Sequence, residues 1–599
     1  MPRTCCDAPP ALTDDQKALV AKLQRIVGPE HVLDGTKETT QTLPFLQGAR
    51  LGKGAALAIV QPQRLQQVVD CVQAIVDANC VVLPQGQNTG LTGGSVPHAD
   101  RPTVVLSLRQ LDRLFPIDNG ERVVCLPGVG LASLQAFLDQ HFPHRETHST
   151  LGSTFLNPTC AAGVAFGSGG TQLRKGPAYT ERALYLKVSK NKWNENVVEV
   201  VDTLGIEGME GEDDGLKKDT AASRVDRWSR HVSQGHERKM RYSSKKGNGL
   251  LPASDTDYAR RICQNDSSIS RYNADTRGPD FNRSEGKVIL LATVHDTFEK
   301  PKETKTFWLS FDSLDTALNF RRKVCLDNPK DLPVSMEYMD RDSFDIVDRS
   351  GRLMGNAIKV VGTSSPWLRQ LWNIKLWIEA LPFSFAPTIV DRVVHLSNPV
   401  FPAIMPKRIM DAGKSMDHHV AMTVGEYGDG NMGRLLDRLE KFRKEEGDDK
   451  VKVLECEKKE VQSLTAFRFV AATAFRTWCV GNGAQGISID YALPKNGGGT
   501  PTIPSDVAQP LKRMRYSHFA CNVVHEDLAY PAGVDTHQAK HDLKHRIEAE
   551  NGGRLPAEHG HGTEYIAPAE AQTRWKSMDP LNVFNPGVGG LSDKYKYQE

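Results

Sequence analysis

The chain has 599 residues, of which 39% are hydrophobic and 25% are charged, so two or three domains with sizeable cores are expected. Its 75 Lys and Arg residues nearly balance its 73 Asp and Glu residues, and a net charge of +2 argues against a protein that mainly binds nucleic acid. The 11 cysteines form no CxxC pair and are expected to be reduced thiols. No apolar run has signal-peptide or membrane-spanning length, so we expect any membrane contact to be peripheral, on the cytoplasmic side of the cell membrane or of an organelle.

The first 150 residues alternate between helix and strand patterns. Residues 13–27 predict a capped amphipathic helix, and residues 63–79 repeat apolar positions at helical spacing. Strands are expected at 57–62, 80–84, 103–108 and 122–128, and a further helix at 131–142. This mixture indicates an α+β or α/β domain.

The composition changes after residue 190. Residues 190–285 are polar and lack apolar periodicity, which predicts long exposed excursions from the first domain. A strong strand at 287–298 restores the regular pattern. We therefore expect three parts, namely a first domain at 1–300, a second domain at 301–510 and a segment rich in His and Gly motifs at 511–599.

Two glycine-rich loops are the most informative segments. PQGQNTGLTGGSVP (84–97) directly follows a predicted strand, and GSTFLNPTCAAGVAFGSGGTQLRKGP occupies 152–177. Small residues let such loops turn tightly and present backbone N–H groups to an anion. The first loop is not a GxGxxG helix opening and has no Walker lysine, which disfavours nicotinamide and P-loop binding. One loop alone would be better explained as a flexible surface turn, but two could clamp a long diphosphate from both sides.

At these loops the sequence resembles flavoproteins of the vanillyl-alcohol oxidase and PCMH type, and more narrowly the membrane-associated, quinone-dependent D-lactate dehydrogenase family. The matching segments run in order from about residue 15 to 590: QNTGLTGGS (87–95), RKGPAYTE (174–181), RYNAD (271–275), GKVILLATVHDTF (286–298), EYMDRDSFDI (337–346), AEHGHGTEYIAPAE (557–570) and DPLNVFNPG (579–587). The resemblance implies an α+β fold, in which a PCMH-type, two-subdomain FAD-binding unit carries an inserted α/β cap domain that associates with the membrane.

The resemblance also implies which residues contact FAD. They are Gly86, Gln87, Asn88, Thr89, Gly90, Gly94 and Ser95 in the first loop, Gly152, Thr159 and Gly169 in the second, Leu290 on the adenine side and Asn585 near the flavin. For each glycine the alternative is turn geometry alone, and for Asn585 it is a helix-end turn. The second loop departs from the family pattern at residues 162–163 and 166–167, so side-chain hydrogen bonds near the flavin ring are expected to differ.

Histidines near the C-terminus suit the oxidation of a 2-hydroxy acid. That reaction needs a base for the hydroxyl proton, a cation for the carboxylate and a hydride acceptor beside carbon 2, here flavin N5. Imidazole suits the base because its ordinary pKa of roughly 6.5 lies near neutral pH. By resemblance, His559 is the base, and His518, His525 and Glu558 can hold a divalent metal. Residues seven apart in one strand face opposite ways, so His518 and His525 could bind one metal only if the strand bends between them. The alternative is that both are hydrogen-bonded core residues.

The cation that orients the substrate carboxylate is the least specified part of this site. Arg468 is the leading candidate, because it lies in LTAFRFVAATAFR (464–476), where the wider family often places a substrate arginine. This segment predicts one helix with Arg476 roughly on the same face. The alternative is an ordinary surface arginine.

Aromatic and basic residues gather in the second domain. The stretch 365–385 predicts a helix at 366–381 that carries Trp367, Trp372 and Trp377 with basic neighbours, as is typical of a membrane interface. Each Trp alone would suit a domain core. The basic segment 238–246 is expected to be a solvated loop, with a contact to anionic lipid as the alternative.

These expectations combine into one hypothesis. FAD accepts a hydride from D-lactate, which becomes pyruvate, and the electrons then pass to a quinone in the membrane. One alternative is a flavin dehydrogenase for another D-2-hydroxy acid. The other is a catalytically inactive, flavin-free binding protein that retains the fold.

Overall fold

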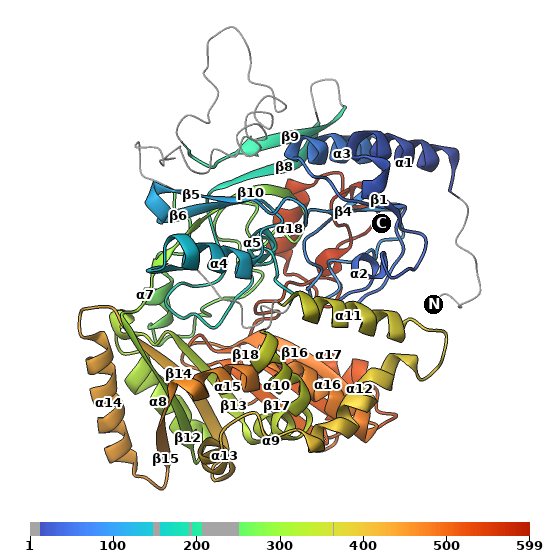
Figure 1. Cartoon of the computed structure of the whole chain (residues 1–599). Coiled ribbons are helices and arrows are strands. Elements are labelled where there is room, and N and C mark those ends of the chain that lie inside the picture. Colours follow the sequence, from blue (N-terminus) through green and yellow to red (C-terminus); the bar gives the residue numbers. More distant parts are fainter. Residues whose placement is uncertain (1–11, 148–155, 191–194, 207–250, 363–364, 599) are drawn as a thin grey trace.

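The computed structural model describes residues 12–147, 156–190, 195–206, 251–362 and 365–598. Gly152 and the basic segment 238–246 lie outside these residues. The described elements form two lobes (Figure 1). We call the part with the elements up to β11, together with α18, the upper lobe, and the part from β12 to α17 the lower lobe.

The first sheet of the upper lobe is built as the sequence predicts. Its strand order is β1-β2-β4-β3, with β2, β4 and β3 parallel. Thr13 and Gln16 form a capping box that starts the first helix, and α1 packs on α3. The elements are β1 (Val32–Asp34), β2 (Ala58–Val60), β3 (Val81–Gln85), β4 (Thr103–Ser107), α1 (Asp14–Val27), α2 (Leu43–Leu46) and α3 (Leu65–Asp77).

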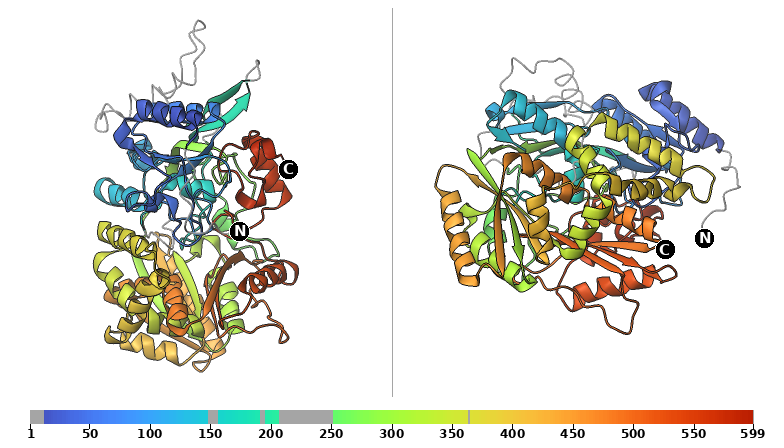
Figure 2. Two further views of the ribbon diagram at one scale, coloured as in Figure 1. Left: turned by 90° about the vertical axis from the view of Figure 1, so that its right-hand side faces the viewer. Right: turned by 60° about the horizontal axis from the view of Figure 1, so that its bottom comes forward.

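The second sheet of the upper lobe is antiparallel, with the order β5-β6-β10-β8-β9. Its elements are β5 (Leu114–Ile117), β6 (Arg122–Cys125), β8 (Ala183–Lys190), β9 (Asn196–Asp202), β10 (Ile289–Asp296), α4 (Leu131–His141), α5 (Cys160–Phe166), α7 (Tyr258–Ile262) and the pair β7 (Arg145–Glu146) and β11 (Phe298–Glu299). One hydrophobic core includes residues of both sheets. The end of the chain returns to this lobe through α18 (Ala569–Met578) (Figure 2).

The lower lobe contains a seven-stranded antiparallel sheet with the order β15-β12-β14-β13-β17-β18-β16. Its strands are β12 (Glu303–Phe311), β13 (Ser335–Asp340), β14 (His418–Glu426), β15 (Val451–Cys456), β16 (Gln485–Ala492), β17 (Lys512–His518) and β18 (Val523–Tyr530). Its helices are α8 (Leu314–Phe320), α9 (Arg341–Ser350), α10 (Arg352–Val361), α11 (Pro366–Glu379), α12 (Ala386–Ser397), α13 (Lys407–Lys414), α14 (Asn431–Glu446), α15 (Lys458–Phe469), α16 (Ala471–Asn482) and α17 (Thr536–Ala549). The sheet takes strands from both sides of the boundary that we expected at residue 511. Helix α11 lies at the border of the lobes and packs on α2 (Figure 1).

Two segments differ from the sequence-based expectation. Residues 251–285 are not an exposed excursion, since polar side chains such as Arg271 and Asn282 are buried there and bond to buried partners. The segment 464–476 forms two helices rather than one, because the chain breaks at Val470 between α15 and α16. The prediction that Arg468 and Arg476 share one helical face is therefore wrong.

Candidate functional site

Four strands of the lower sheet carry two histidines and two carboxylates on one face. Glu337 of β13 pairs with His518 of β17, and Asp490 of β16 pairs with His525 of β18. Tyr516 lies two residues before His518 and pairs with His525, so both histidines point the same way. The spacing of seven residues therefore needs no bulge, because a tight turn joins two antiparallel strands. The two imidazole centroids are 5.3 Å apart.

His518 bridges two carboxylates. Its Nδ1 lies 2.7 Å from Glu337 Oε1, and its Nε2 lies 2.7 Å from Glu558 Oε1. Burial disfavours a charge here, but the two carboxylates outweigh it and raise the pKa of His518 to about 10. His525 Nε2 lies 3.4 Å from the same Glu558 oxygen, and burial lowers the pKa of His525 to about 4. The ligand atoms of His518, His525 and Glu558 all lie within 4.8 Å of one another.

His559 forms a second pair with Asp490. Its Nδ1 lies 3.2 Å from Asp490 Oδ2, which also accepts the backbone N–H groups of Ala557 and Glu558 at 3.0 Å each. Burial opposes the charged form of His559, but Asp490 outweighs it and raises the pKa of the imidazole. The His559 side chain is 30% exposed, whereas that of Asp490 is 5% exposed. The pair therefore fixes Nδ1 and leaves Nε2 to meet a substrate.

The segment 557–562 connects the lower sheet with the upper lobe. Glu285 of the upper lobe accepts two backbone N–H groups of this segment at 2.7 and 3.0 Å. Thr92 of the first glycine loop donates to a carbonyl oxygen of the segment at 3.2 Å. A Cβ added at Gly94 would lie 2.9 Å from the Cα of Gly562, so loop and segment touch. The candidate base therefore lies directly beside the loop that is expected to bind FAD.

The first glycine loop is held by its own polar side chains. Asn88 has a φ of 55°, and its side chain donates to the carbonyls of Pro44 and Gln47 at 3.0 and 2.8 Å. Ser95 donates to Asn88 Oδ1 at 2.8 Å, and a Cβ added at Gly90 would lie 3.1 Å from the Ser95 hydroxyl. Asn88 and Ser95 thus shape the loop, whatever contact they make with a cofactor.

The two glycine loops meet at the start of α5. Thr159 caps this helix by accepting the backbone N–H of Ala162 at 3.2 Å. A Cβ added at Gly86 would lie 2.8 Å from the Thr159 hydroxyl. Gln87 Oε1 is buried without a hydrogen-bond partner among the described residues. The close backbone approach fits a diphosphate held between the loops, and the unpaired acceptor fits a hydroxyl or N–H donor elsewhere on such a cofactor.

The second loop and the C-terminal segment complete this cradle. A Cβ added at Gly169 would lie only 1.7 Å from Glu558 Oε2, so the second loop reaches the histidine cluster. Asn585 has a φ of 41°, and its side chain donates to the carbonyls of Gly94 and Glu285 at 3.0 and 2.8 Å. In the part of the chain that the structure describes, Asn585 Oδ1 is buried and unpaired. The residues therefore fit FAD, although each individual contact stays a prediction.

Leu290 lies slightly apart from these loops. It is 5% exposed and packs with Val164 of α5 and Trp575 of α18 in a hydrophobic cluster. Its contact with the adenine of FAD stays a prediction.

The arginines near the cluster are engaged by carboxylates. Arg271 NH2 lies 3.3 Å from Glu558 Oε2. Arg468 Nε lies 2.9 Å from Glu337 Oε2, and its guanidinium lies 4.6 Å from the ring centroid of Tyr516. Arg468 is thus part of the site, and its role as the carboxylate clamp stays a prediction. Arg476, by contrast, pairs at 2.7 Å with Asp391 of α12 and at 2.8 Å with Glu379 of α11.

Sequence reasoning did not select four residues of this site. Glu337 and Asp490 each stand inside a buried strand, and a carboxylate within an apolar strand was the signal that could have found them. Arg271 stands in RYNAD, which served only to support the family resemblance. Arg50, whose guanidinium donates to the carbonyl of Ser488 on β16 at 3.2 Å, carries no sequence signal beyond Gly48 and Gly52, two residues away on either side.

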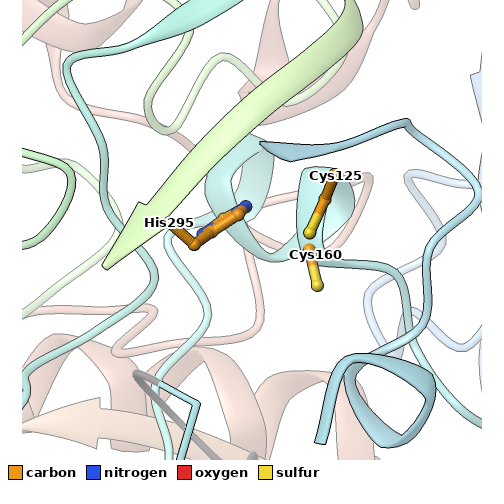
Figure 3. A group of neighbouring side chains, drawn as sticks. All are labelled: Cys125, Cys160 and His295. Carbon is orange, nitrogen blue, oxygen red and sulfur yellow. The ribbon is translucent and has the colours of Figure 1, made fainter. Parts of the chain in front are cut away.

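A second group of residues that could in principle bind a metal ion lies in the upper lobe (Figure 3). Cys125 of β6, Cys160 of α5 and His295 of β10 are buried, and both thiols belong to an apolar cluster with Val123 and Leu134. Burial raises the pKa of the Cys125 thiol well above its ordinary value and lowers the pKa of His295 to about 4. We interpret these side chains as neutral packing groups.

Comparison with solved structures and family models defines the class of protein. The fold is shared with 4-ethylphenol oxidase from Gulosibacter chungangensis, at a TM-score of 0.56 and 13% identity over 98% of this chain and 99% of that chain. It is also shared with alkyldihydroxyacetonephosphate synthase, at a TM-score of 0.55 and 13% identity over 97% and 86% of the two chains. A model described as FAD binding domain matches residues 56–184. The chain is therefore an FAD-binding protein of the PCMH-type fold, as predicted.

Full-length relatives identify the family. The chain is 32% identical to the quinone-dependent D-lactate dehydrogenase of Corynebacterium glutamicum, over 98% of each chain. It is 31% identical to the enzyme of the same name from Escherichia coli K12, over 98% of this chain and 99% of that one. A model described as D-lactate dehydrogenase, membrane binding, matches residues 306–597. This chain belongs to the family of quinone-dependent D-lactate dehydrogenases.

Proposed function

We propose that this protein oxidises D-lactate to pyruvate with FAD and passes the electrons to a membrane quinone. The observation that carries the proposal is the imidazole of His559, fixed by Asp490 beside the glycine loops of the FAD-binding domain. The relatives that align with 98% of this chain are named quinone-dependent D-lactate dehydrogenases, after this substrate and this electron acceptor.

The reaction needs one proton acceptor and one hydride acceptor. When bound, FAD supplies the hydride acceptor for carbon 2 of the substrate. His559 accepts the hydroxyl proton at Nε2, because its Nδ1 is already bonded to Asp490. Asp490 stabilises the imidazolium that results, and it also anchors the backbone of residues 557–558. The glycines at 560 and 562 let this segment pack closely, because a Cβ added there would lie 2.4 Å from Phe166 and 2.2 Å from Thr92.

The variant His559→Gln tests this role. We expect the variant to keep its FAD absorbance, while anaerobic reduction by D-lactate slows about 100-fold or more. His541→Gln, on the exposed face of α17, is the matched control and should behave as wild type. In a panel of D-lactate, L-lactate and D-2-hydroxyglutarate, D-lactate should reduce the flavin fastest. Unchanged reduction in His559→Gln, or a preference for another acid, would contradict the proposal.

We also propose that His518, His525 and Glu558 bind a divalent metal ion. A carboxylate behind the ligating histidine is the usual support of such sites, and Glu337 takes this position at Nδ1 of His518. The ion would polarise the oxygen atoms of the hydroxy acid. Elemental analysis of the purified protein should find about one metal per chain. His525→Ala should lose the metal but keep FAD; a fully active protein without metal would leave the histidines as hydrogen-bonded core residues.

We propose that the apolar surface of residues 360–400 contacts the lipid bilayer. Among the described residues, 15 large hydrophobic side chains are exposed, and 11 of them fall in this range. They are Val360, Val361, Trp367, Leu371, Ile374, Trp377, Phe383, Phe385, Val393, Leu396 and Val400. So concentrated a patch marks an interaction surface. The matching family model carries the words membrane binding, and none of the described helices is long and apolar enough to cross a membrane.

Vesicle sedimentation tests this surface. The double variant Leu371→Ser/Ile374→Ser should lose binding to lipid vesicles but keep the reduction of a soluble dye by D-lactate. Val507→Ser, which removes an exposed apolar side chain outside the patch, is the control. Protease protection in cells should place the contact on the cytoplasmic side. Full vesicle binding by the double variant would contradict the proposal.

A further inference from the structure

Arg50 occupies the tip of a tight loop between α2 and β2. The backbone N–H of Gly48 donates to the carbonyl of Gly52 at 2.9 Å and closes this loop. The loop lies against the first glycine loop, since a Cβ added at Gly93 would lie 3.8 Å from the Cβ of Leu51. The backbone of Arg50 is thus placed by the same structure that is expected to bind FAD.

The guanidinium of Arg50 reaches the strand that holds the candidate base. Its Nη2 donates to the carbonyl of Ser488 at 3.2 Å. Ser488 lies two residues before Asp490 on β16, and Asp490 is the partner of His559. The Arg50 guanidinium therefore contacts the same part of β16 as the candidate base. Burial lowers the pKa of His559, and Asp490 raises it. The positive charge of Arg50 also lowers this pKa, because it opposes protonation of the imidazole.

Arg50 differs from the other two arginines of the site because it has no carboxylate partner among the described residues. Arg271 and Arg468 lie 3.3 and 2.9 Å from glutamate oxygens. Across the described ranges of the chain, no carboxylate oxygen lies within 4 Å of the Arg50 guanidinium, and the side chain is exposed. The guanidinium therefore keeps donors unused, and a guanidinium fork can bind a carboxylate through two parallel hydrogen bonds.

Taking the proposed function as its basis, we infer that Arg50 binds the carboxylate of the 2-hydroxy acid. In a 2-hydroxy acid the carboxylate and the hydroxyl stand on adjacent carbons, so one molecule meets Arg50 and His559 together. The clamp then comes from the FAD-binding part of the chain rather than from α15. It selects anionic acids over neutral analogues of the same size.

The variant Arg50→Met tests the inference. Its kcat/KM for D-lactate should fall about 10- to 100-fold, while that for neutral D-lactamide stays at the wild-type value. Lys53→Met is the matched control, because Lys53 lies on the same loop but pairs with Glu38 at 2.8 Å. It should behave as wild type with both compounds. Added guanidinium chloride should partly restore D-lactate oxidation in Arg50→Met, and Arg50→Lys should be intermediate.

Binding of oxalate, which cannot be oxidised at carbon 2, gives a readout without turnover. Followed by the flavin absorbance, oxalate should bind Arg50→Met about 10-fold or more weakly at unchanged flavin content and melting temperature. Equal losses with D-lactate and D-lactamide would show that Arg50 only ties the two lobes together and would overturn the inference. Wild-type protein that D-lactate cannot reduce would refute the proposed function instead, and the oxalate titration would still test Arg50.

Discussion

Replacing Asp490 by Asn perturbs the pair that fixes the candidate base. The carboxylate accepts three N–H groups, from His559 at 3.2 Å and from Ala557 and Glu558 at 3.0 Å each. All three groups donate to Oδ2, so the single oxygen of an Asn side chain can take over these contacts. The hydrogen bond to His559 can then persist, but His559 loses its counter-charge.

The expected magnitude follows from these contacts. A hydrogen bond to a charged group contributes about 1–1.5 kcal/mol more than one to a neutral group, so anaerobic flavin reduction by D-lactate should slow about 5- to 15-fold near neutral pH. Burial lowers and Asp490 raises the pKa of His559, so the pKa of the imidazole falls in the variant. Because the base must be neutral to accept a proton, the acid limb of the kcat/KM profile should move to lower pH. The rate loss should therefore shrink as the pH decreases.

Stopped-flow reduction of the bound flavin across the pH range measures both effects. Asp506→Asn, in an exposed loop, controls for the loss of one negative charge. The reasoning is refuted if Asp490→Asn slows the reaction while its acid limb stays at the wild-type pH. It is also refuted if the limb moves to higher pH.

Three other changes have defined outcomes. Gly94→Ala should lose FAD, because the added Cβ would lie 2.9 Å from the backbone of Gly562. The control is Gly433→Ala on α14, where the added Cβ meets no atom within 4 Å. It should keep FAD and raise the free energy of unfolding in urea by about 0.5–1 kcal/mol. Lys287→Met should cost about 3–5 kcal/mol of unfolding free energy, because it leaves the buried carboxylate of Asp579, 3.6 Å away, without its cation. Glu337→Gln should weaken metal binding about 10- to 100-fold in a competition titration with a chelator, and an unchanged affinity would contradict the proposed metal site.

Local sequence patterns predicted the elements of the upper lobe because each pattern is confined to neighbouring residues. The capping box at Thr13 and the apolar repeat of residues 63–79 both appear as expected in α1 and α3. The break at Val470 was missed, since the residues on both sides of it favour a helix and only their packing separates α15 from α16. Tertiary packing decided this point, and a single sequence does not contain it.

The candidate site depends on strand pairing more than on any motif. Sequence reasoning selected His518 and His525, but only the β17–β18 hairpin explains why they share a face. Glu337 joins them because β13 lies next to β17, across a separation of 181 residues. Arg50 is separated in the sequence by 438 residues from Ser488, its hydrogen-bond partner. Contacts of such range follow from the topology of the sheet and the docking of the lobes.

Anaerobic addition of D-lactate to the purified, yellow protein tests the central claim most directly. The flavin absorbance should bleach with about one D-lactate consumed per FAD, and pyruvate should appear in the same amount, since one hydride leaves each substrate molecule. A protein that retains its FAD and stays fully oxidised with D-lactate would contradict the account.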